Sequence, residues 1–314
     1  MICPANVLLD LSAIRSQWLA CADQRRELLQ TGRARPLRDI AVDWTVVLAS
    51  VALVMAGGGW WIPLALLLIG NRQRALGNIL HDAGHRNLSR DARANDRVAN
   101  TLVAPLLFAS LSHYRALHFT HHLALGDARR DPDFLPVPSG PARHWSLRFA
   151  GAALSWRTWR GSIGGHLVER TVPLATKGRI LAWWVVLLIS LDLVGGLDFV
   201  VAFVVLWFGA RATVFHLITT FREMCDHVGL EPGGIFSFTR DVRTRDLWRW
   251  VIHPRNNGYH LTHHLCPAVP YYRLPDAHRM FSRLPAYRDR ATVCDAYFSG
   301  SGAVTRSWSR VAAR

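Results

Sequence analysis

The sequence predicts an all-α integral membrane protein with four transmembrane helices in two hairpins and a cytoplasmic helical cap rich in histidine. Three observations lead to this fold class. Half of the 314 residues are hydrophobic and the mean hydropathy is positive, which is unusual for a soluble enzyme. The long apolar runs come in two pairs, and glycines separate the members of each pair. Clusters of histidine lie outside these runs, in the polar parts of the chain.

The N-terminal residues 5–30 place apolar side chains at helical spacing, with arginines among them. This pattern is typical of an amphipathic helix on a membrane surface, and equally of a helix packed against the rest of the protein. No basic start followed by an apolar core and a small-residue cleavage site occurs, so a signal peptide is not expected. We expect three regions: a cytoplasmic amphipathic segment (1–39), a membrane domain (40–280) and a basic cytoplasmic tail (281–314).

The first hairpin is predicted from the apolar runs 40–55 and 60–70, which flank three consecutive glycines at 57–59. From Trp61 to His81 the chain advances about twenty residues, or about 30 Å of helix, which matches the thickness of the hydrocarbon core. The second helix should therefore place His81 and His85 just beyond the inner membrane face. Three polar residues in its last turns should face the protein interior rather than lipid, namely Asn71, Arg72 and Arg74.

The second hairpin is predicted from the apolar runs 180–194 and 197–220, which flank Gly195 and Gly196. Between the hairpins, residues 96–112 are apolar but interrupted by Pro105, which favours a re-entrant or interfacial segment. A loop should follow at 131–141, and His144 and His166 have no partner at metal-binding spacing and should be surface residues. Arg211 lies deep in the last run and needs a partner, for which the candidates are Asp192 and Asp198.

Four spans place both termini and all histidine clusters on one side of the membrane. The arginine-rich segment 71–179 makes this side cytoplasmic, and we expect a multi-pass protein of the inner or plasma membrane of a bacterium. The net charge of +15 could indicate nucleic-acid binding, but thirteen tryptophans and the apolar runs favour an anionic lipid surface instead. The five cysteines show no CxxC spacing and should be free thiols in a reducing compartment; thiolate ligation by Cys225 or Cys266 is a minor alternative.

The histidine clusters predict a site for two metal ions. They have the spacings HxxxH, HxxHH and HxxHH, with one further histidine between the last two, and their members are His81, His85, His118, His121, His122, His227, His260, His263 and His264. Residues i, i+3 and i+4 share one face of a helix, so each cluster presents its imidazoles together. Imidazole binds first-row transition metals well, and nine rings are too many for one four-coordinate ion. Two metals with four or five nitrogen ligands each would use them all.

A polar stripe crosses the last apolar run at helical spacing, formed by His216, Thr220, Glu223 and His227. Glu223 could bind metal directly or through water, or could orient a ligand imidazole. Asp82 and Asp226 adjoin clustered histidines and are expected to accept hydrogen bonds from imidazole N–H groups. Proton transfer by these three carboxylates is an alternative role. For His216, a structural role through hydrogen bonds and a catalytic role both stay open.

These motifs resemble the membrane-bound fatty acid desaturase superfamily, the histidine-box di-iron enzymes that include acyl desaturases, lipid hydroxylases and carotenoid ketolases. Residues 257–267, Asn-Gly-Tyr-His-Leu-Thr-His-His-Leu-Cys-Pro, are similar to the third histidine box of that family. Tyr114-Arg115 before the second box and Asp131-Pro132-Asp133 after it also fit. One departure is Thr262, where many members carry glutamate. The resemblance covers residues 40–280.

The resemblance implies a di-iron centre with the nine clustered histidines as ligands and O₂ as co-substrate. It implies a lipid or fatty acyl substrate that enters from the bilayer. No haem motif like that of a fused cytochrome b5 occurs in the sequence, so we expect a separate electron donor: ferredoxin, rubredoxin, cytochrome b5 or a flavoprotein. Desaturation is the expected reaction, and hydroxylation or ketolation of a lipid is the alternative.

Two other classes of protein fit less well. A zinc-dependent membrane hydrolase would need three ligands and a general base, as in HExxH, and this motif does not occur in the sequence. A non-catalytic haem or metal-transport protein would place its histidines within the spans, whereas here the clusters lie beyond them.

Overall fold

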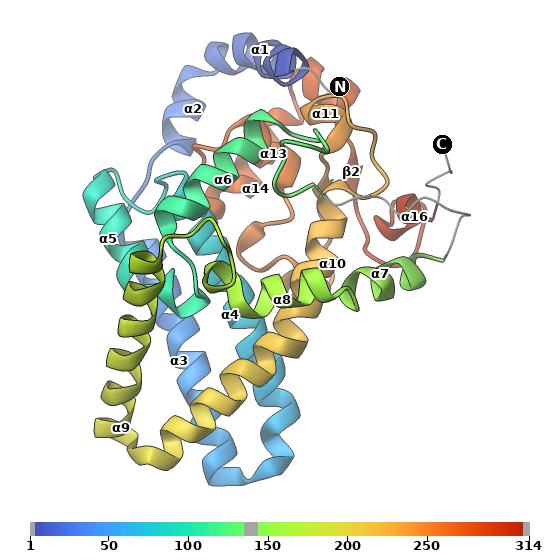
Figure 1. Ribbon diagram of the computed structural model, residues 1–314. Helices are drawn as coiled ribbons and strands as arrows, with labels where there is room; N and C mark the ends of the chain where they lie inside the picture. The colour runs from blue at the N-terminus through green and yellow to red at the C-terminus, as the bar shows by residue number, and fades with distance from the viewer. Residues whose placement is uncertain (1–3, 135–143, 310–314) are drawn as a thin grey trace. The chain divides into compact units, whose positions relative to one another are not determined.

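The computed structural model of the protein describes residues 4–134 and 144–309, and these residues are mostly helical (Figure 1). The chain divides into two compact units. The hairpin unit consists of Gly32–Tyr114 and Ala152–Thr220, and the terminal unit consists of Met1–Thr31, Arg115–Gly151 and Phe221–Arg314. The part of the predicted loop from 135 to 143 lies outside the described residues.

The elements of the hairpin unit are, in chain order, α3 (Ala34–Gly57), η1 (Gly59–Trp61), α4 (Ile62–Gly84), α5 (Ala92–Leu102), η2 (Pro105–Leu107), α8 (Trp156–Gly164), η3 (Gly165–Leu167), α9 (Leu174–Ala210) and the π-helical turn η4 (Arg211–Phe215). Three helices contain residues of both units, α6 (Leu111–Leu123), α7 (Trp145–Ala153) and α10 (His216–His227).

Helices α3 and α4 form the first predicted hairpin and lie side by side (Figure 1). The chain turns at Gly58, whose φ of 80° is readily adopted only by glycine. The polar residues of α4 face inward: Arg72 Nη1 lies 3.0 Å from Asp43 Oδ1, and Gln73 donates a 2.9 Å hydrogen bond to the Trp207 carbonyl. Asn71 and Arg74 are also buried, so these side chains face the protein interior, as expected.

The second predicted hairpin is a single helical stretch with a break. Gly196, with φ 77° and ψ 171°, interrupts α9 at the predicted turn, and α9 changes direction within its length (Figure 1). Among the residues that the structure describes, two stretches are long and apolar enough to cross a membrane: Ala34–Gly57 and the 54-residue run Leu174–His227. At 1.5 Å per residue the second stretch would measure about 80 Å if it were straight, far more than the hydrocarbon core of about 30 Å.

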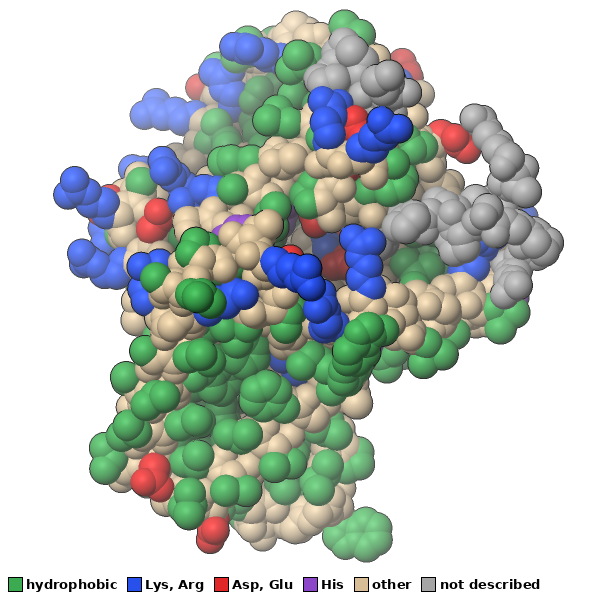
Figure 2. Space-filling model, in the orientation of Figure 1, with side chains coloured by type: hydrophobic (Ala, Val, Ile, Leu, Met, Phe, Trp, Pro, Cys, Tyr) green, Lys and Arg blue, Asp and Glu red, His purple; other side chains and the backbone are tan. Residues whose placement is uncertain are grey.

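The hairpin unit exposes a broad apolar surface. Figure 2 shows hydrophobic side chains gathered over α3 and α9. Residues on both sides of the Gly196 break are more than half exposed, including Val185, Val186, Ile189, Leu193, Val194, Leu197, Val201 and Val205. Soluble proteins rarely expose a contiguous apolar surface of this extent. Such a surface is typical of helices that face lipid.

The segment predicted to be re-entrant or interfacial contains the end of α5 and the short turn η2, and two tryptophans of α9 contact it. Trp183 and Trp184 donate hydrogen bonds of 2.9 Å to the carbonyls of Thr101 and Pro105. Because the chain leaves the helical pattern here, carbonyl groups become available to side chains.

Arg211 uses such carbonyls, and it donates to Leu107 O (3.0 Å) and Ile163 O (2.9 Å). The prediction of a carboxylate partner, Asp192 or Asp198, is therefore wrong.

His166 lies in the same region and is half-buried, so its prediction as a surface residue is wrong. Its Nδ1 accepts a 2.9 Å hydrogen bond from the Ser110 amide, and its ring meets that of His113 edge-on at 4.8 Å. These partners are distant in sequence, and only the tertiary fold brings them together. His144 is exposed, as predicted.

The terminal unit contains α1 (Pro4–Ala20), α2 (Ala22–Leu28), α11 (Ile235–Phe238), β1 (Asp241–Val242), α12 (Trp248–Ile252), η5 (Pro254–Asn256), α13 (His260–Leu265), η6 (Tyr271–Arg273), α14 (Leu274–Phe281), α15 (Pro285–Arg290), β2 (Val293–Cys294) and α16 (Thr305–Trp308). Val7, Ile14 and Trp18 of α1 are buried, and the Trp18 ring packs edge-on against Phe281 at 4.9 Å. This supports the packed alternative for the N-terminal helix.

A short parallel strand pair departs from the purely helical prediction. In β1 and β2, Asp241 pairs with Val293. The Asp241 carboxylate is fully buried and accepts hydrogen bonds from the Thr262 amide (3.0 Å), the His278 ring (2.7 Å) and the Tyr287 hydroxyl (2.6 Å). The Thr262 hydroxyl donates a further 2.5 Å hydrogen bond to it. The carboxylate thus holds the short helix α13, which carries the third histidine cluster.

Candidate metal centre

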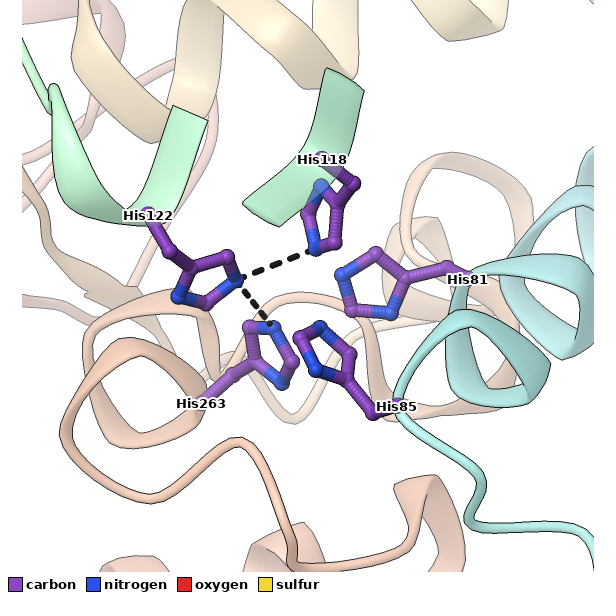
Figure 3. Close-up of side chains that lie close together, drawn as sticks. All are labelled: His81, His85, His118, His122 and His263. Carbon is purple, nitrogen blue, oxygen red and sulfur yellow. Dashed lines mark hydrogen bonds between the residues drawn. The ribbon is translucent and has the colours of Figure 1, made fainter. Parts of the chain in front are cut away.

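The second histidine cluster lies at the C-terminal end of α6. Because an α-helix turns by about 100° per residue, His118 and His122 lie nearly in line, while His121 points to one side. His122 Nε2 lies 3.0 Å from His118 Nε2 and 3.1 Å from His263 Nε2 of α13 (Figure 3). These three rings, from two elements of the terminal unit, form what we call the first nitrogen group.

A second nitrogen group combines His121, His227, His260 and His264, which come from α6, α10 and α13. All four rings are buried, and their ligand nitrogens lie within 4.8 Å of one another. His264 Nε2 is 3.3 Å from His121 Nε2 and 3.1 Å from His260 Nε2. His260 Nε2 is in turn 3.1 Å from His227 Nε2.

Each HxxHH cluster divides its rings between the two groups. In α6 the pair His118 and His122 joins the first group and His121 joins the second. In α13 the assignment is reversed, since His260 and His264 join the second group and His263 the first. The expectation that a cluster presents three imidazoles together is thus refined: a pair at i and i+4 acts together, and the third ring serves the neighbouring group.

The spacing of the nitrogens fits metal ligation. Nitrogens about 2.1 Å from one ion lie about 3.0 Å apart at a right angle and about 3.4 Å apart at the tetrahedral angle. In the second group the Nε2 atoms approach one another at 3.1 to 3.3 Å, within this range. A hydrogen-bonded chain would explain the contacts less well, because the single N–H of His264 cannot be shared with two neighbours. The donor set, neutral imidazole nitrogen, suits iron, zinc or copper.

The far side of several rings is anchored, which turns Nε2 toward the centre of the group. His121 Nδ1 lies 2.8 Å from Asp131 Oδ1, and His227 Nδ1 donates a 2.8 Å hydrogen bond to the Phe238 carbonyl. Metal-binding histidines commonly have such an acceptor on the other nitrogen, because it fixes the tautomer and the orientation of the ring.

The protonation state of two rings of the second group also suits ligation. Burial, together with the neighbouring imidazoles, lowers the pKa of His260 and of His264 well below the usual value, so both rings are neutral at pH 7. Burial alone would lower the pKa of His121 as well, but the hydrogen bond with Asp131 and the charge of Asp133 outweigh it and raise this pKa. The same hydrogen bond makes the His121 imidazole a stronger base and a better ligand.

The first histidine cluster belongs to the hairpin unit. His81 lies in the last turn of α4, and His85 is the residue that ends this helix. Their ring centroids are 5.3 Å apart (Figure 3). The HxxxH spacing therefore brings two imidazoles together at one helix end, as predicted.

The predicted carboxylates differ in their surroundings. Asp226 is buried, with Oδ2 2.5 Å from Arg222 Nη2 and 3.6 Å from His260 Nδ1, so it lies where it can orient a ring of the second group. Asp82 is buried within α4, and Glu223 is half-buried on α10, one turn before His227.

Two roles were left open for His216, a structural one through hydrogen bonds and a catalytic one. Its Nε2 lies 2.8 Å from the Ala153 carbonyl and its Nδ1 lies 2.8 Å from the Ser162 hydroxyl, which supports the structural role. Cys266 belongs to neither nitrogen group, which speaks against thiolate ligation by this residue, and burial raises its pKa to about 11. Asp131 is a residue that sequence reasoning did not assign to the site, although the Asp-Pro-Asp stretch after the second cluster was a signal for it.

Comparison with known proteins decides the family. Residues 58–294, which contain all nine clustered histidines, match the family described as "Fatty acid desaturase". The chain belongs to the fatty acid desaturase family. Members of this family are membrane-associated oxidoreductases, and this chain is an enzyme of desaturase type.

Three of its relatives show the range of desaturases to which this chain is similar. It is 29% identical over 269 residues to dihydrorhizobitoxine desaturase of Bradyrhizobium elkanii. The aligned region covers 79% of this chain and 75% of that protein. It is 26% identical to an endoplasmic reticulum omega-3 fatty acid desaturase of Vigna radiata var. radiata (77% and 70% covered). It is also 26% identical to a chloroplastic temperature-sensitive sn-2 acyl-lipid omega-3 desaturase (ferredoxin) of Arabidopsis thaliana (77% and 60% covered).

Proposed function

We propose that this desaturase uses O₂ and external electrons at a di-iron centre to introduce a double bond into a fatty acyl or lipid chain. The observation that supports it is the division of two HxxHH clusters into two separate nitrogen groups, as two ions would require. Iron bound there would activate O₂, the oxidant that breaking an unactivated C–H bond requires. The substrate loses two hydrogen atoms. These combine with O₂, two electrons and two protons to give two molecules of water, so the reaction balances.

We propose all nine clustered histidines as ligands. The second group supplies four nitrogens to one ion. The first group supplies three to the other ion, and the sequence pattern of the family supports His81 and His85 as its further ligands. Asp131 and Asp226 would hold His121 and His260 in the orientation that ligation requires. Glu223, one turn from His227, is the carboxylate we propose for a water-mediated contact or for proton transfer.

We propose that α3, α4 and the two arms of the stretch broken at Gly196 stand in the membrane as four spans. The support is the exposed apolar surface of the hairpin unit and the inward position of the polar residues of α4. Trp60, 94% exposed at the turn of the first hairpin, has the amphipathic ring typical of a membrane–water interface. By the distribution of arginine, the histidines would face the cytoplasm of a bacterium.

A second candidate substrate class follows from the relatives. The relative at 29% identity acts on dihydrorhizobitoxine, and its name does not mention a fatty acid. A substrate other than a fatty acyl chain is therefore the alternative for this protein. Hydroxylation or ketolation of a lipid is the alternative reaction, since histidine ligands alone do not select between loss of a second hydrogen and oxygen insertion.

The test combines metal analysis with mass spectrometry. The purified protein should hold about two irons per chain after anaerobic loading with Fe²⁺. Aerated cells that express the wild type should contain a product two mass units lighter than its precursor, and cells that express His263→Ala should lack it. A product sixteen units heavier would establish a hydroxylase instead. Protein that holds only zinc and stays inactive after iron loading would refute the proposal.

A further inference from the structure

The terminal unit carries an exposed patch of arginine and large apolar residues at and before α12, which we call the Arg–Trp patch: Arg243, Arg245, Leu247, Trp248, Arg249 and Trp250. Asp246 is the one exposed carboxylate within this stretch, so the net charge of the patch is positive. Leu247 is 80% exposed, Trp248 49% and Trp250 55%. The Arg249 guanidinium lies 4.6 Å from the centre of the Trp250 ring. Arginine and tryptophan are the residues most enriched at the centres of protein interfaces, where few residues contribute most of the binding energy.

A chain of ring contacts leads inward from this patch. Trp248 packs edge-on against Phe298 at 5.2 Å, and Phe298 lies 6.0 Å from the buried Tyr297. Tyr297 stacks on His253 at 5.6 Å, and its hydroxyl lies 2.7 Å from His253 Nδ1. Only Trp248 among these residues is largely exposed, so the contacts connect the surface to the interior of the unit.

The chain of contacts ends at the second nitrogen group. His253 Nε2 lies 3.9 Å from Asp226 Oδ1, and Asp226 Oδ2 lies 3.6 Å from His260 Nδ1. His260 Nε2 faces the centre of the group, 3.1 Å from His227 Nε2. Every residue between the patch and the group lies in the terminal unit. The contacts Trp248, Phe298, Tyr297, His253, Asp226 and His260 are therefore continuous from solvent to a proposed ligand.

We propose that the Arg–Trp patch binds a small acidic iron–sulfur protein of the ferredoxin type, and that these contacts carry its electrons to the metal centre. This inference rests on the proposed function. In each encounter the reduced cluster of the donor loses one electron and the centre gains it, and two encounters supply the two electrons that the reaction consumes. The exposed arginines suit an acidic partner, and a relative's name includes ferredoxin.

An anionic lipid surface would also attract arginine and tryptophan. The contacts from the patch to His260 favour the electron donor, because a lipid anchor needs no continuous path to the metal site. Binding of the Arg–Trp patch to lipid is therefore the alternative result of the binding test.

The binding test uses the full-length protein in nanodiscs and a plant-type [2Fe–2S] ferredoxin. The double variant Arg245→Glu/Arg249→Glu should raise the Kd for ferredoxin at least tenfold, and the wild-type Kd should rise with salt. The matched control Arg283→Glu/Arg288→Glu changes the net charge equally at exposed positions elsewhere in the same unit, and its Kd should stay within twofold. Equal effects of the two double variants would overturn the proposal. So would a fluorophore at Leu247→Cys that is quenched by lipid-borne quenchers while ferredoxin binding is unaffected by the charge reversal.

The transfer test compares two reductants of the iron-loaded protein. Tyr297→Phe keeps the stacked ring and removes the hydroxyl contact with His253, so electron transfer from bound ferredoxin should slow at least fivefold at an unchanged Kd. The ratio of the ferredoxin-driven to the dithionite-driven reduction rate should fall by the same factor. An unchanged ratio would overturn the proposed path while leaving the proposed function intact. Absence of product even after dithionite reduction would refute the proposed function, and this inference with it.

Discussion

Replacing Asp131 by asparagine tests the anchoring of the second nitrogen group with almost no change in shape. The Asp131 carboxylate receives three contacts: the ring of His121 at 2.8 Å, the Gly126 amide at 2.8 Å and the Asp133 amide at 3.0 Å. An asparagine side chain has one acceptor oxygen, and its NH₂ group must then face an N–H donor. Whichever way the amide is turned, at least one of these contacts is lost.

The size of the effect follows from these contacts. Mutation of the carboxylate behind a metal-binding histidine, here to a neutral amide that is a weaker acceptor, typically lowers metal affinity by about 10- to 100-fold, or about 1.4–2.8 kcal/mol. A buried N–H donor left without an acceptor should lower the free energy of unfolding by about 1–3 kcal/mol more. Because His121 belongs to the second group, we expect one of the two irons to bind more weakly and the other to be retained.

The assay is a titration of the iron-loaded protein with a competing Fe²⁺ chelator, followed by iron analysis. The matched control is Asp133→Asn, because this carboxylate lies 4.0 Å from His121 Nδ1 and is 58% exposed. We expect the control to change iron affinity less than twofold. If Asp131→Asn and Asp133→Asn release iron at the same chelator concentration, the argument that a buried carboxylate orients His121 is wrong.

Three further predictions concern the hairpin turn, the ligand set and the metal. Gly196→Ala should lower the free energy of unfolding in detergent by about 1–2 kcal/mol, since φ is 77°, whereas Gly178→Ala, with open space around it, should be neutral or stabilising. His264→Asn should reduce the iron content by about one per chain, while His216→Asn should keep both irons and unfold at a lower temperature, since it loses buried hydrogen bonds. Removal of iron by a chelator should lower the unfolding temperature in calorimetry, and added Fe²⁺ should restore it. An unchanged transition would show that the histidine groups do not bind iron in the folded protein.

Features encoded locally could be predicted from the sequence. The apolar runs became the helices α3, α4 and α9, and the glycines that separate them became the turn at Gly58 and the break at Gly196. Every member of both nitrogen groups belongs to one of the histidine clusters that the sequence singles out. These features depend on helical periodicity, on the length of a run and on backbone angles that glycine tolerates, all of which are properties of a short stretch of chain.

Features that depend on tertiary contacts could not be predicted in the same way. The partners of Arg211 are backbone carbonyls, exposed where the chain leaves a helix, and no sequence pattern distinguishes them from a carboxylate. Asp131 reaches His121 because the loop after α6 turns back, and this path is set by packing. The strand pair β1–β2 is two residues long in each strand, too short for an alternating pattern to reveal.

The division of the two HxxHH clusters has a consequence for how the site forms. Helices α6 and α13 each contribute to both nitrogen groups, so a shift of either helix by one residue would turn its rings by about 100° and disrupt both groups at once. A metal bound in one group would therefore fix the rotation of both helices and would align the ligands of the other group. The buried Asp241 carboxylate also fixes the rotation of α13, because it accepts hydrogen bonds from the amide and hydroxyl of Thr262. The hydroxyl of Thr262 is a donor, which a buried carboxylate requires, and an ionised glutamate at this position would place two negative charges together. In this chain, the hydrogen bonds from Thr262 to Asp241 thus fix the orientation of the third histidine cluster.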